Sequence, residues 1–346
     1  DLRGNSGGLL NNAINMLDVL TDRGMNLLST KGRMDRANKT IKSRRKPLLS
    51  SHVPIVVLIN RSTASASEIL AGVLQDLDRA VIVGQQSFGK GLVQSMFNLN
   101  DTTTIKITTA KYYTPSGRLI QKQDYLDNGF LTDGLDKKDS LFTTLSGREV
   151  KGGGGISPDV ETEVNRFPPF IQGLWKSGAF LEFASNYVPA NDIEAPIIIT
   201  DDIVNNFKNF LEGYDVNYKL PGEKELEKLK EKISKEEIET DNFLQSIANS
   251  LMFWKDSGIN SLTHHLDDYF SQERNSQFNN LENIKWIKNG LLREMYRVLE
   301  GEKDRIRVSL FEDADYKLAV SILKDLNRYY DILTPVDVSD KEAEVD

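Results

Sequence analysis

Cysteine is absent from the sequence, and histidine occurs only three times in 346 residues. The lack of cysteine excludes disulfide bonds, thiol nucleophiles and cysteine-based metal sites, and it is compatible with an exported or a cytosolic protein. His264 and His265 are adjacent in a polar helical stretch, where neighbouring side chains point in different directions. His52 lies far from both along the chain. We therefore expect no metal site and no cofactor.

The sequence also lacks a long apolar run. A membrane-spanning helix needs about 18 or more consecutive apolar residues, and no segment provides them. The opening residues, DLRGNSGG, have neither the basic start nor the apolar stretch of a signal peptide. With 39% apolar and 27% charged residues the composition is that of a globular protein, and the length predicts two domains.

Negative charge is concentrated in the second half of the chain. Residues 1–165 carry 21 basic and 17 acidic side chains, whereas the whole chain has a net charge of −8. The acidic balance argues against nucleic acid as a partner, because phosphate binding needs clustered positive charge. One basic cluster is either a solvated surface loop or a site for an anionic partner. It consists of Lys31, Arg33, Arg36, Lys39, Lys42, Arg44, Arg45 and Lys46.

The first 165 residues alternate between helical and strand patterns. Apolar residues at helical spacing predict helices, and short β-branched runs predict buried strands. The predicted elements are helices over 9–20 and 67–77, strands over 52–60 and 80–84, and a hairpin over 92–113. The strand–helix–strand order implies parallel strands with a right-handed crossover.

From about residue 166 the pattern changes to helices, many of them rich in lysine and glutamate. Pro168 and Pro169 are expected to stop regular structure there. This predicts an α/β domain over 1–165 and a mainly helical domain over 166–346. The helix candidates are 202–212, 223–238, 240–254, 281–299 and 313–332.

Three polar loops are expected to meet at one edge of the parallel sheet. Loops that follow parallel strands lie at the same edge, where α/β proteins bind ligands. RSTASASE (61–68) follows the first predicted strand, QQSFGKG (85–91) follows the second, and DLRGNSGG (1–8) precedes the first helix. We therefore expect the reactive residues to lie in these loops.

Ser65 stands where the second predicted helix begins. Ser65 and Glu68 fit the Ser-x-x-Glu capping pattern, so one interpretation is that Ser65 only caps the helix. A nucleophilic serine at a strand-to-helix turn has the same pattern, and there the free amides of the helix N-terminus stabilise an oxyanion. Such a serine needs a base. His52 lies at the far end of the strand, so a histidine triad is excluded.

Lys90 is the expected base. Ser–Lys pairs replace Ser–His pairs in some proteases, provided that burial keeps the lysine neutral. Lys90 lies between Gly89 and Gly91, on the same predicted edge as Ser65. Taken alone it would be an ordinary solvated loop lysine, and only the pairing with Ser65 favours a catalytic role.

Gly7 and Gly8 precede the helix over 9–20. Backbone amides are unpaired at a helix start, and glycine lets a substrate approach closely. A plain flexible turn explains the same residues. We expect one of these amides, together with the amide of Ala66, to form an oxyanion hole.

Two other motifs are set aside. Residues 4–8, GNSGG, resemble the GDSGG of trypsin-like proteases, but no histidine and aspartate of a triad fit before Ser6. Residues 84–91 nearly match the phosphate-binding loop G-x-x-x-x-G-K-[ST]. Gly91 replaces the hydroxyl of that motif, and a strand rather than a helix is expected to follow.

Four long segments occur in an order and spacing typical of one protease family. They are DLRGNSGG, VVLINRSTASASEILAGVLQD, DRAVIVGQQSFGKGLVQ and TAKYYTPSGRLIQ. They resemble the carboxyl-terminal processing peptidases, also called tail-specific proteases. GREVKGGGGISPDVE (147–161) is similar to the end of their catalytic domain, and 286–325 is similar to the helical tail of long bacterial members. The resemblance implies a crotonase/ClpP-like α/β core with parallel βαβ units, followed by a mainly helical domain.

The resemblance also implies roles for individual residues. It makes Ser65 the nucleophile, Lys90 the general base and Gln94 the residue that orients the lysine. On a strand, positions 90 and 94 share a face, but a direct hydrogen bond would need the chain to bend. Glu68 and Asp76 match acidic positions around the nucleophile helix, where structural support is the expected role. The implied reaction is endopeptidase cleavage of protein substrates near their C-termini through a Ser65 acyl-enzyme.

The resemblance further implies an upstream PDZ-like domain, an export signal and a location in the periplasm or cell envelope. Because the chain begins inside a family motif, we expect residues 1–346 alone to be weakly active. Protein or peptide substrates are the expected partners, and self-association is compatible with the family. Three alternatives remain: a non-catalytic peptide binder, an acyl-CoA enzyme of the crotonase fold, and a nucleotide-binding protein.

Overall fold

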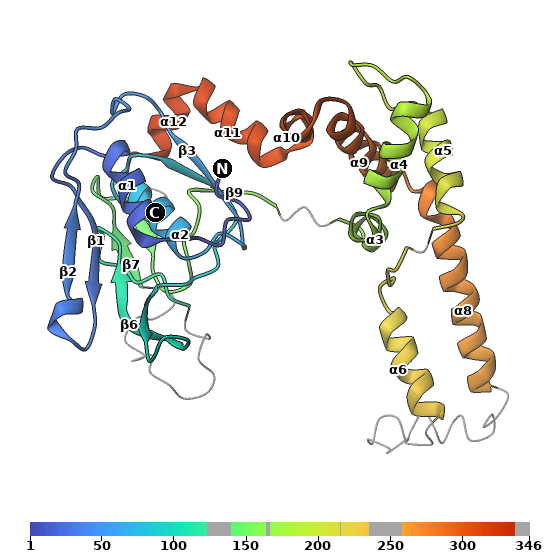
Figure 1. Ribbon diagram of the computed structural model, residues 1–346, viewed down its shortest axis with the longest axis horizontal. Helices are drawn as coiled ribbons and strands as arrows, with labels where there is room; N and C mark the ends of the chain where they lie inside the picture. The colour runs from blue at the N-terminus through green and yellow to red at the C-terminus, as the bar shows by residue number, and fades with distance from the viewer. Residues whose placement is uncertain (123–139, 164–166, 215, 235–257, 336–346) are drawn as a thin grey trace, which may run out of the picture. The chain divides into compact units, whose positions relative to one another are not determined.

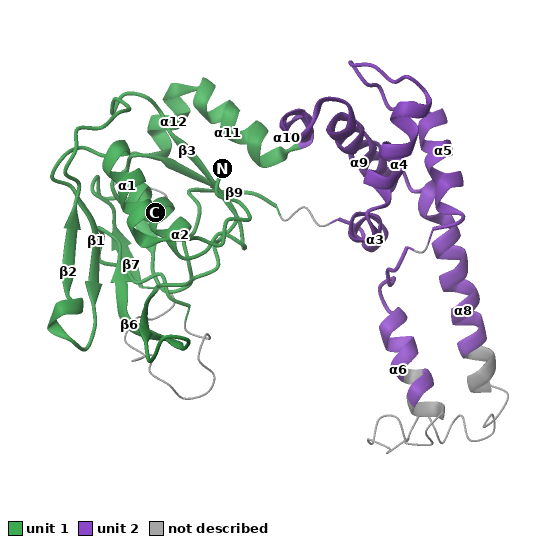
Figure 2. Ribbon diagram, in the orientation of Figure 1, with its two compact units in different colours: residues 1–164, 313–346 green, residues 165–312 purple. Residues whose placement is uncertain are grey.

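The computed structural model describes residues 1–122, 140–163, 167–214, 216–234 and 258–335 (Figure 1). The chain divides into two compact units (Figure 2): residues 1–164 with 313–346, and residues 165–312. The sequence placed every residue after 165 in one helical domain, whereas the structure groups the last segment with the first unit. Among the helices of the described ranges, none is both long and apolar enough to cross a membrane.

A three-stranded parallel sheet with the order β3-β4-β9 lies in the first unit. Its strands are β3 (Val56–Ile59), β4 (Val81–Gly84) and β9 (Val160–Glu161), and α2 (Ala66–Asp76) connects the first two. β3 and β4 consist of apolar residues and one glycine, which suits strands covered on both faces. The predicted α/β class with a parallel βαβ unit is thereby confirmed.

Alternate residues of these strands enter two different hydrophobic clusters. Ile59 and Ile82 pack on one side, with residues of α1 (Leu10–Leu20) and α2. Val81 and Val83 pack on the other side, with residues from the end of the chain. Each fully buried side chain of this kind contributes about 1.5–3 kcal/mol. Both covers therefore contribute to the stability of the sheet.

Two C-terminal helices cover the second face of the sheet. They are α11 (Ala314–Lys324) and α12 (Leu326–Ile332). Ile322 of α11 is fully buried in the cluster that holds Val81 and Val83. The hydroxyl of Tyr329 accepts a hydrogen bond from Ile55 N at 3.1 Å and donates one to Ile55 O at 3.2 Å. These contacts explain why the segment after residue 312 belongs to the first unit.

A second, antiparallel sheet has the order β2-β1-β6-β5. The predicted hairpin is present as β5 (Leu92–Asn98) and β6 (Thr104–Tyr113). β1 (Asn26–Lys31) and β2 (Lys39–Lys42) were not predicted, and they turn part of the expected basic loop into strands. The charged side chains of this segment reach solvent, while its backbone forms the hydrogen bonds of the sheet. Leu27 and Leu28 provide its buried side.

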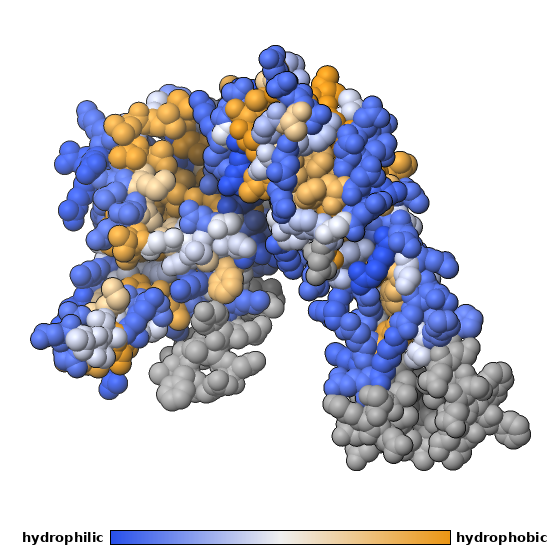
Figure 3. Space-filling view, turned by 45° about the vertical axis from the view of Figure 1, so that its right-hand side comes forward, coloured by the Kyte–Doolittle hydropathy of each residue, from blue (hydrophilic) through white to orange (hydrophobic). Residues whose placement is uncertain are grey.

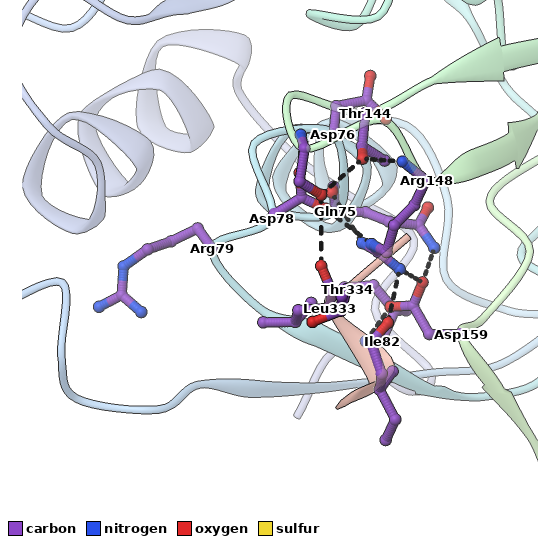
Figure 4. A network of polar contacts seen from close by, with 12 residues as sticks. Gln75, Asp76, Asp78, Arg79, Ile82, Thr144, Arg148, Asp159, Leu333 and Thr334 are labelled. Atoms are coloured by element: carbon purple, nitrogen blue, oxygen red, sulfur yellow. Dashed lines mark hydrogen bonds and ion pairs between the residues drawn. The ribbon is translucent and has the colours of Figure 1, made fainter. Parts of the chain in front are cut away.

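A polar network fixes the C-terminal end of α2 (Figure 4). Arg148 donates to Asp78 Oδ1 and to Asp159 Oδ1, both at 2.7 Å. Asp159 Oδ2 accepts from Ile82 N at 2.7 Å. Arg148 precedes the second strand of a short hairpin, which comprises β7 (Leu141–Thr143) and β8 (Glu149–Lys151). One guanidinium thus holds α2, β4 and this hairpin together.

The described part of the second unit is helical. Its helices are α3 (Pro169–Ser177), α4 (Ala179–Ala190), α5 (Asp201–Leu211), α6 (Glu223–Ser234), α8 (Gly258–Ser276), α9 (Leu281–Glu300) and α10 (Glu302–Ser309). The double proline was expected to stop regular structure, but Pro169 begins α3. Proline is tolerated at the first helical position, where its missing N–H would have no partner. The helix predicted over 240–254 lies outside the described residues.

Aromatic side chains fill the core of this unit. Phe180 of α4 stacks on Phe207 of α5 with ring centroids 5.2 Å apart. The Phe180 ring also lies against Gly290 of α9, where a Cβ would come within 2.7 Å of it. Glycine is therefore required at 290 for the two helices to pack this closely.

Outside the cores, the face shown in Figure 3 is largely hydrophilic, with hydrophobic groups exposed on both units.

Candidate active site

Ser65 occupies the turn between β3 and α2 with φ 57° and ψ −119°. A positive φ is costly for a residue with a Cβ, and residues held in this way are concentrated at functional sites. The backbone N–H of Ser65 donates to Oε2 of Glu68 at 2.8 Å, as the predicted capping pattern requires. The turn places Ser65 at the N-terminal end of α2, where the helix dipole favours negative charge.

Glu68 is 0% exposed and accepts four hydrogen bonds. Its Oε2 accepts from Ser65 N at 2.8 Å and from Lys90 N at 2.9 Å. Its Oε1 accepts from Ser87 Oγ at 2.5 Å and from Gly89 N at 2.7 Å. A buried carboxylate needs such partners, because an unpaired charge in the interior is very unfavourable. One side chain therefore joins the loop of Ser65 to the loop of Lys90.

Two opposing effects act on the Glu68 carboxyl. Burial raises the pKa of Glu68 above its ordinary value, and the hydrogen bonds from Ser87, Lys90, Gly89 and Ser65 work in the opposite direction. All four contacts are donors, so they suit the ionised form. The site thus holds a carboxylate whose charge depends on the geometry of both loops.

Tyr112 of β6 makes a second bridge between the same loops. Its hydroxyl donates to the carbonyl oxygen of Lys90 and to that of Ser65, the latter at 3.3 Å. Burial, together with the Glu68 charge, raises the pKa of Tyr112 well above its ordinary value, so the hydroxyl stays protonated. Neither Tyr112 nor Ser87 was singled out from the sequence. The segments that resemble the protease family, TAKYY and QQSFGKG, contain both.

Lys90 is half-buried, and Gln121 and Lys122 bind its two glycine neighbours. Gly91 N donates to Gln121 Oε1 at 2.8 Å, and Lys122 N donates to Gly89 O at 3.0 Å. These contacts fix the backbone of the lysine on both sides. They involve no side-chain atom of Lys90.

Gln94 lies on β5 and is exposed. The pairing of β5 with β6 shifts register between Val93 and Gln94, which is the kind of bend that contact with Lys90 would need. Among the described residues, the side chains of Lys90 and Gln94 are not hydrogen-bonded to each other. The structure therefore places Gln94 on the strand that leaves the Lys90 loop, without a contact between the two side chains.

The 1–8 loop comes very close to the Ser65 turn at Gly7. A Cβ on Gly7 would lie 2.6 Å from Ala64 O, 2.8 Å from Ala66 N and 2.9 Å from Ser65 Cβ, and φ here is +96°. Only glycine fits such an approach. Gly7 N donates to Asn5 Oδ1 at 2.9 Å, so this amide is already engaged.

Two amides near Ser65 have no partner. Within the described residues, neither Gly8 N nor Ala66 N forms a hydrogen bond. Ala66 is the first residue of α2, so its amide is one of those that a helix leaves unpaired. Of the two predicted glycines, Gly8 is therefore the one whose amide is available.

Asp76 lies at the other end of α2 from Ser65, roughly 16 Å along the helix at about 1.5 Å per residue. Its carboxylate contacts the Arg118 guanidinium at 2.7 Å, with both side chains fully buried. Ser116 N donates to Asp76 Oδ2 at 2.9 Å. Burial lowers the pKa of Arg118, and the Asp76 charge opposes that effect. These contacts anchor α2 away from the reactive loops.

In the part of the chain that the structure describes, no three or more His, Cys, Asp and Glu side chains gather in a way that would hold a metal ion.

Comparisons with known proteins match both units. Residues 1–130 match the model of peptidase family S41, and residues 170–323 match that of a probable PDZ-protease C-terminal helical domain. The photosystem II D1 C-terminal processing protease aligns with 32% identity and a TM-score of 0.35, over 51% of this chain and 37% of that one.

Curated relatives also match part of the chain. The carboxy-terminal-processing protease of Bartonella bacilliformis is 49% identical over 122 residues, which are 35% of this chain and 27% of that protein. The chloroplastic carboxyl-terminal-processing peptidase 1 of Arabidopsis thaliana is 43% identical over 116 residues, 34% of this chain and 23% of that protein. The chain thus spans about a quarter of the length of these relatives. Residues 1–130 are thus similar to peptidase family S41, and the relatives that match this chain are named as carboxyl-terminal processing proteases.

Proposed function

We propose that this chain is the catalytic part of a serine endopeptidase in which Ser65 is the nucleophile and Lys90 the general base. The observation that carries the proposal is the Glu68 carboxylate, which binds the backbone N–H groups of both residues through one oxygen. The positive φ of Ser65 at the start of a helix supports a nucleophilic role. The match to peptidase family S41 supports the reaction class.

The reaction proceeds through an ester of Ser65. Ser65 Oγ attacks the scissile carbonyl carbon and passes its proton to Lys90 Nζ. The electron pair of the carbonyl moves to its oxygen, which accepts hydrogen bonds from Ala66 N and Gly8 N. As the tetrahedral intermediate collapses, the C–N bond breaks and the amine leaves with the proton from Lys90. A water molecule, deprotonated by Lys90, then hydrolyses the ester and restores Ser65.

The other candidate residues act around this centre. Gly7 permits the close approach of the 1–8 loop, and Glu68 and Asp76 position the nucleophile helix. We assign Gln94 the orienting role for Lys90 that the family resemblance implies. This role requires the two side chains to meet in the reacting enzyme.

We infer protein substrates that are cleaved near their C-termini, in the periplasm or cell envelope. The names of the relatives as carboxyl-terminal-processing proteases and the match to a PDZ-protease helical domain support the substrate class. The location follows from the same family resemblance.

The test is cleavage of an unfolded model protein by the full-length protein and by Ser65→Ala and Lys90→Ala. Matched controls are Ser62→Ala in the same loop and Lys106→Ala on the exposed hairpin, and both are expected to retain full activity. Loss of cleavage in the first pair alone would support the dyad. Cleavage that persists in either of them would refute it, and turnover of acyl-CoA without proteolysis would favour the crotonase-like alternative.

A further inference from the structure

Arg3 connects the 1–8 loop to the C-terminal segment of the first unit. Its guanidinium forms a bidentate contact with Asp313, from Nη1 to Oδ1 at 2.8 Å and from Nη2 to Oδ2 at 2.6 Å. Nη1 also donates to Asp315 Oδ2 at 3.0 Å. A paired guanidinium–carboxylate contact of this geometry is among the stronger polar contacts in proteins.

The loop that carries Arg3 is fastened to the Ser65 turn on its other side. Leu2 O accepts from Thr63 Oγ at 2.8 Å, and Asn5 O accepts from Ala64 N at 3.0 Å. Residues on both sides of Arg3 thus bind the turn directly. The position of Arg3 therefore bears on the distance between the 1–8 loop and Ser65.

The ion pairs are largely shielded from solvent. The side chains of Arg3, Asp313 and Asp315 are 17%, 20% and 15% exposed. Burial works against the charge of Arg3, but the two carboxylates outweigh it and raise the pKa of Arg3. Burial alone would raise the pKa of Asp313. Hydrogen bonds from Arg3 and from the amide of Tyr316 instead hold the pKa of Asp313 below its ordinary value. Asp1, within the loop itself, also binds the guanidinium.

Asp313 and Asp315 sit on a well-anchored element. Asp313 caps α11 by accepting from Tyr316 N at 3.0 Å, and Ile322 of the same helix is buried against the parallel sheet. Asp313 is also the first residue of the first unit after the chain leaves the helical unit. The two carboxylates therefore offer Arg3 a fixed partner.

We propose that Asp313 and Asp315 are positioning residues for the peptidase reaction. They hold Arg3, and through it the 1–8 loop, so that Gly8 N reaches the oxyanion that forms on the substrate. The inference rests on the proposed function and adds the C-terminal segment to the machinery of the active site. A displacement of about 1 Å in such a group can lower a rate about a hundredfold, so this anchorage matters for turnover.

The test is the double variant Asp313→Asn/Asp315→Asn in the full-length protein. Asparagine is as good a helix cap as aspartate, so α11 is expected to persist. The two negative charges that face Arg3 are lost. The matched control is Asp325→Asn, which changes the cap of α12 in the same segment and does not touch the loop. Two single variants, Asp315→Asn and Asp315→Glu, show whether loss of the charge at this position is what matters, because the second keeps it.

Two readouts are compared with wild type. We expect kcat to fall about tenfold with KM unchanged, and the amides of Leu2 and Gly4 to exchange with solvent about tenfold faster. The Asp325→Asn control should change neither, and Asp315→Glu should change both less than Asp315→Asn does.

The possible results separate the two proposals. Unchanged exchange, or faster exchange with unchanged kcat, would overturn the positioning role. No cleavage by the wild-type protein would refute the proposed function instead, and the exchange data would still show whether the two carboxylates hold the loop.

Discussion

Ser65 and Lys90 donate their backbone N–H groups to the same atom, Oε2 of Glu68, at 2.8 and 2.9 Å. Both loops therefore depend on one buried side chain for their relative position. A shift of either loop would leave a backbone N–H without an acceptor and the buried Glu68 carboxylate with fewer donors. Glu68 is thus a structural requirement of the candidate dyad, although it takes no part in the proposed chemistry.

Replacing Glu68 by glutamine tests this requirement. Glutamine keeps the shape, but its amide nitrogen cannot accept a hydrogen bond, so at least one backbone N–H that now binds Glu68 loses its partner. Each unsatisfied group costs about 1–3 kcal/mol. We expect a lower free energy of unfolding in urea and a large loss of peptidase activity. Glu149→Gln, an exposed change on β8, is the control, and equal effects of the two variants would contradict the role of Glu68.

Ser87→Ala is expected to make stability depend more strongly on pH. The pKa of Glu68 in the folded protein lies above its ordinary value of 4.5, so the folded state binds this proton more tightly than the unfolded state. The contribution of Glu68 to stability therefore falls as pH rises from 4.5 through the folded pKa. Removing the Ser87 hydroxyl, which donates to the ionised form, raises that pKa further.

The measurement is the free energy of unfolding of wild type and Ser87→Ala as a function of pH. The difference between them should be constant at low pH and grow as pH rises above 4.5. Ser95→Ala removes a hydroxyl that is hydrogen-bonded to Thr109 Oγ1 at 2.8 Å, and it should give a difference that is independent of pH. A pH-independent difference for Ser87→Ala as well would show that its hydroxyl does not act on Glu68.

Gly7→Ala and Gly4→Ala separate backbone strain from steric overlap. Both glycines have positive φ, +96° and +71°, but only a Cβ on Gly7 meets other atoms, whereas Gly4 has nothing within 4 Å. A left-handed residue with a side chain costs about 1–2 kcal/mol. We expect that cost for Gly4→Ala, and a larger loss of both stability and kcat for Gly7→Ala. Similar kcat values for the two variants would argue against a close approach at Gly7.

Tyr329→Phe tests the attachment of the C-terminal helices. It removes the hydroxyl that pairs with both backbone groups of Ile55 and keeps the buried ring. We expect a loss of about 1–3 kcal/mol, because Ile55 N and O lose their shared partner. Tyr330→Phe, at a half-exposed neighbour, should be near neutral in thermal unfolding. Equal melting temperatures for the two variants would count against this attachment.

Much of the first unit could be predicted because its elements carry local patterns. The strands β3 and β4 are short apolar runs, α1 and α2 have apolar residues at helical spacing, and loops after parallel strands meet at one edge. That reasoning was enough to place Ser65 and Lys90 in neighbouring loops. Their assigned roles as nucleophile and base stay predictions.

Other features depend on contacts that no local pattern reveals. β1 and β2 lie in a basic segment whose charges suggested a loop, yet Leu27 and Leu28 give it a buried side. Ser87 donates to Glu68, and Tyr112 donates to the carbonyl oxygen of Ser65, both across long separations in the sequence, so these two contacts could be recognised only in three dimensions. The helical pattern of 313–332 is likewise visible, but its partner surface on the parallel sheet is not.

The return of the last helices to the first unit has a consequence for the biosynthesis of the protein. Ribosomes make the chain from its N-terminus, so Val81 and Val83 emerge long before Ile322 and Tyr329, which cover them. The whole helical unit must be translated in between. During this interval the nascent sheet presents an uncovered apolar face, the kind of surface that favours aggregation and that chaperones bind. The core of the first unit is therefore completed only at the end of translation, and premature termination after residue 312 would yield an incomplete core.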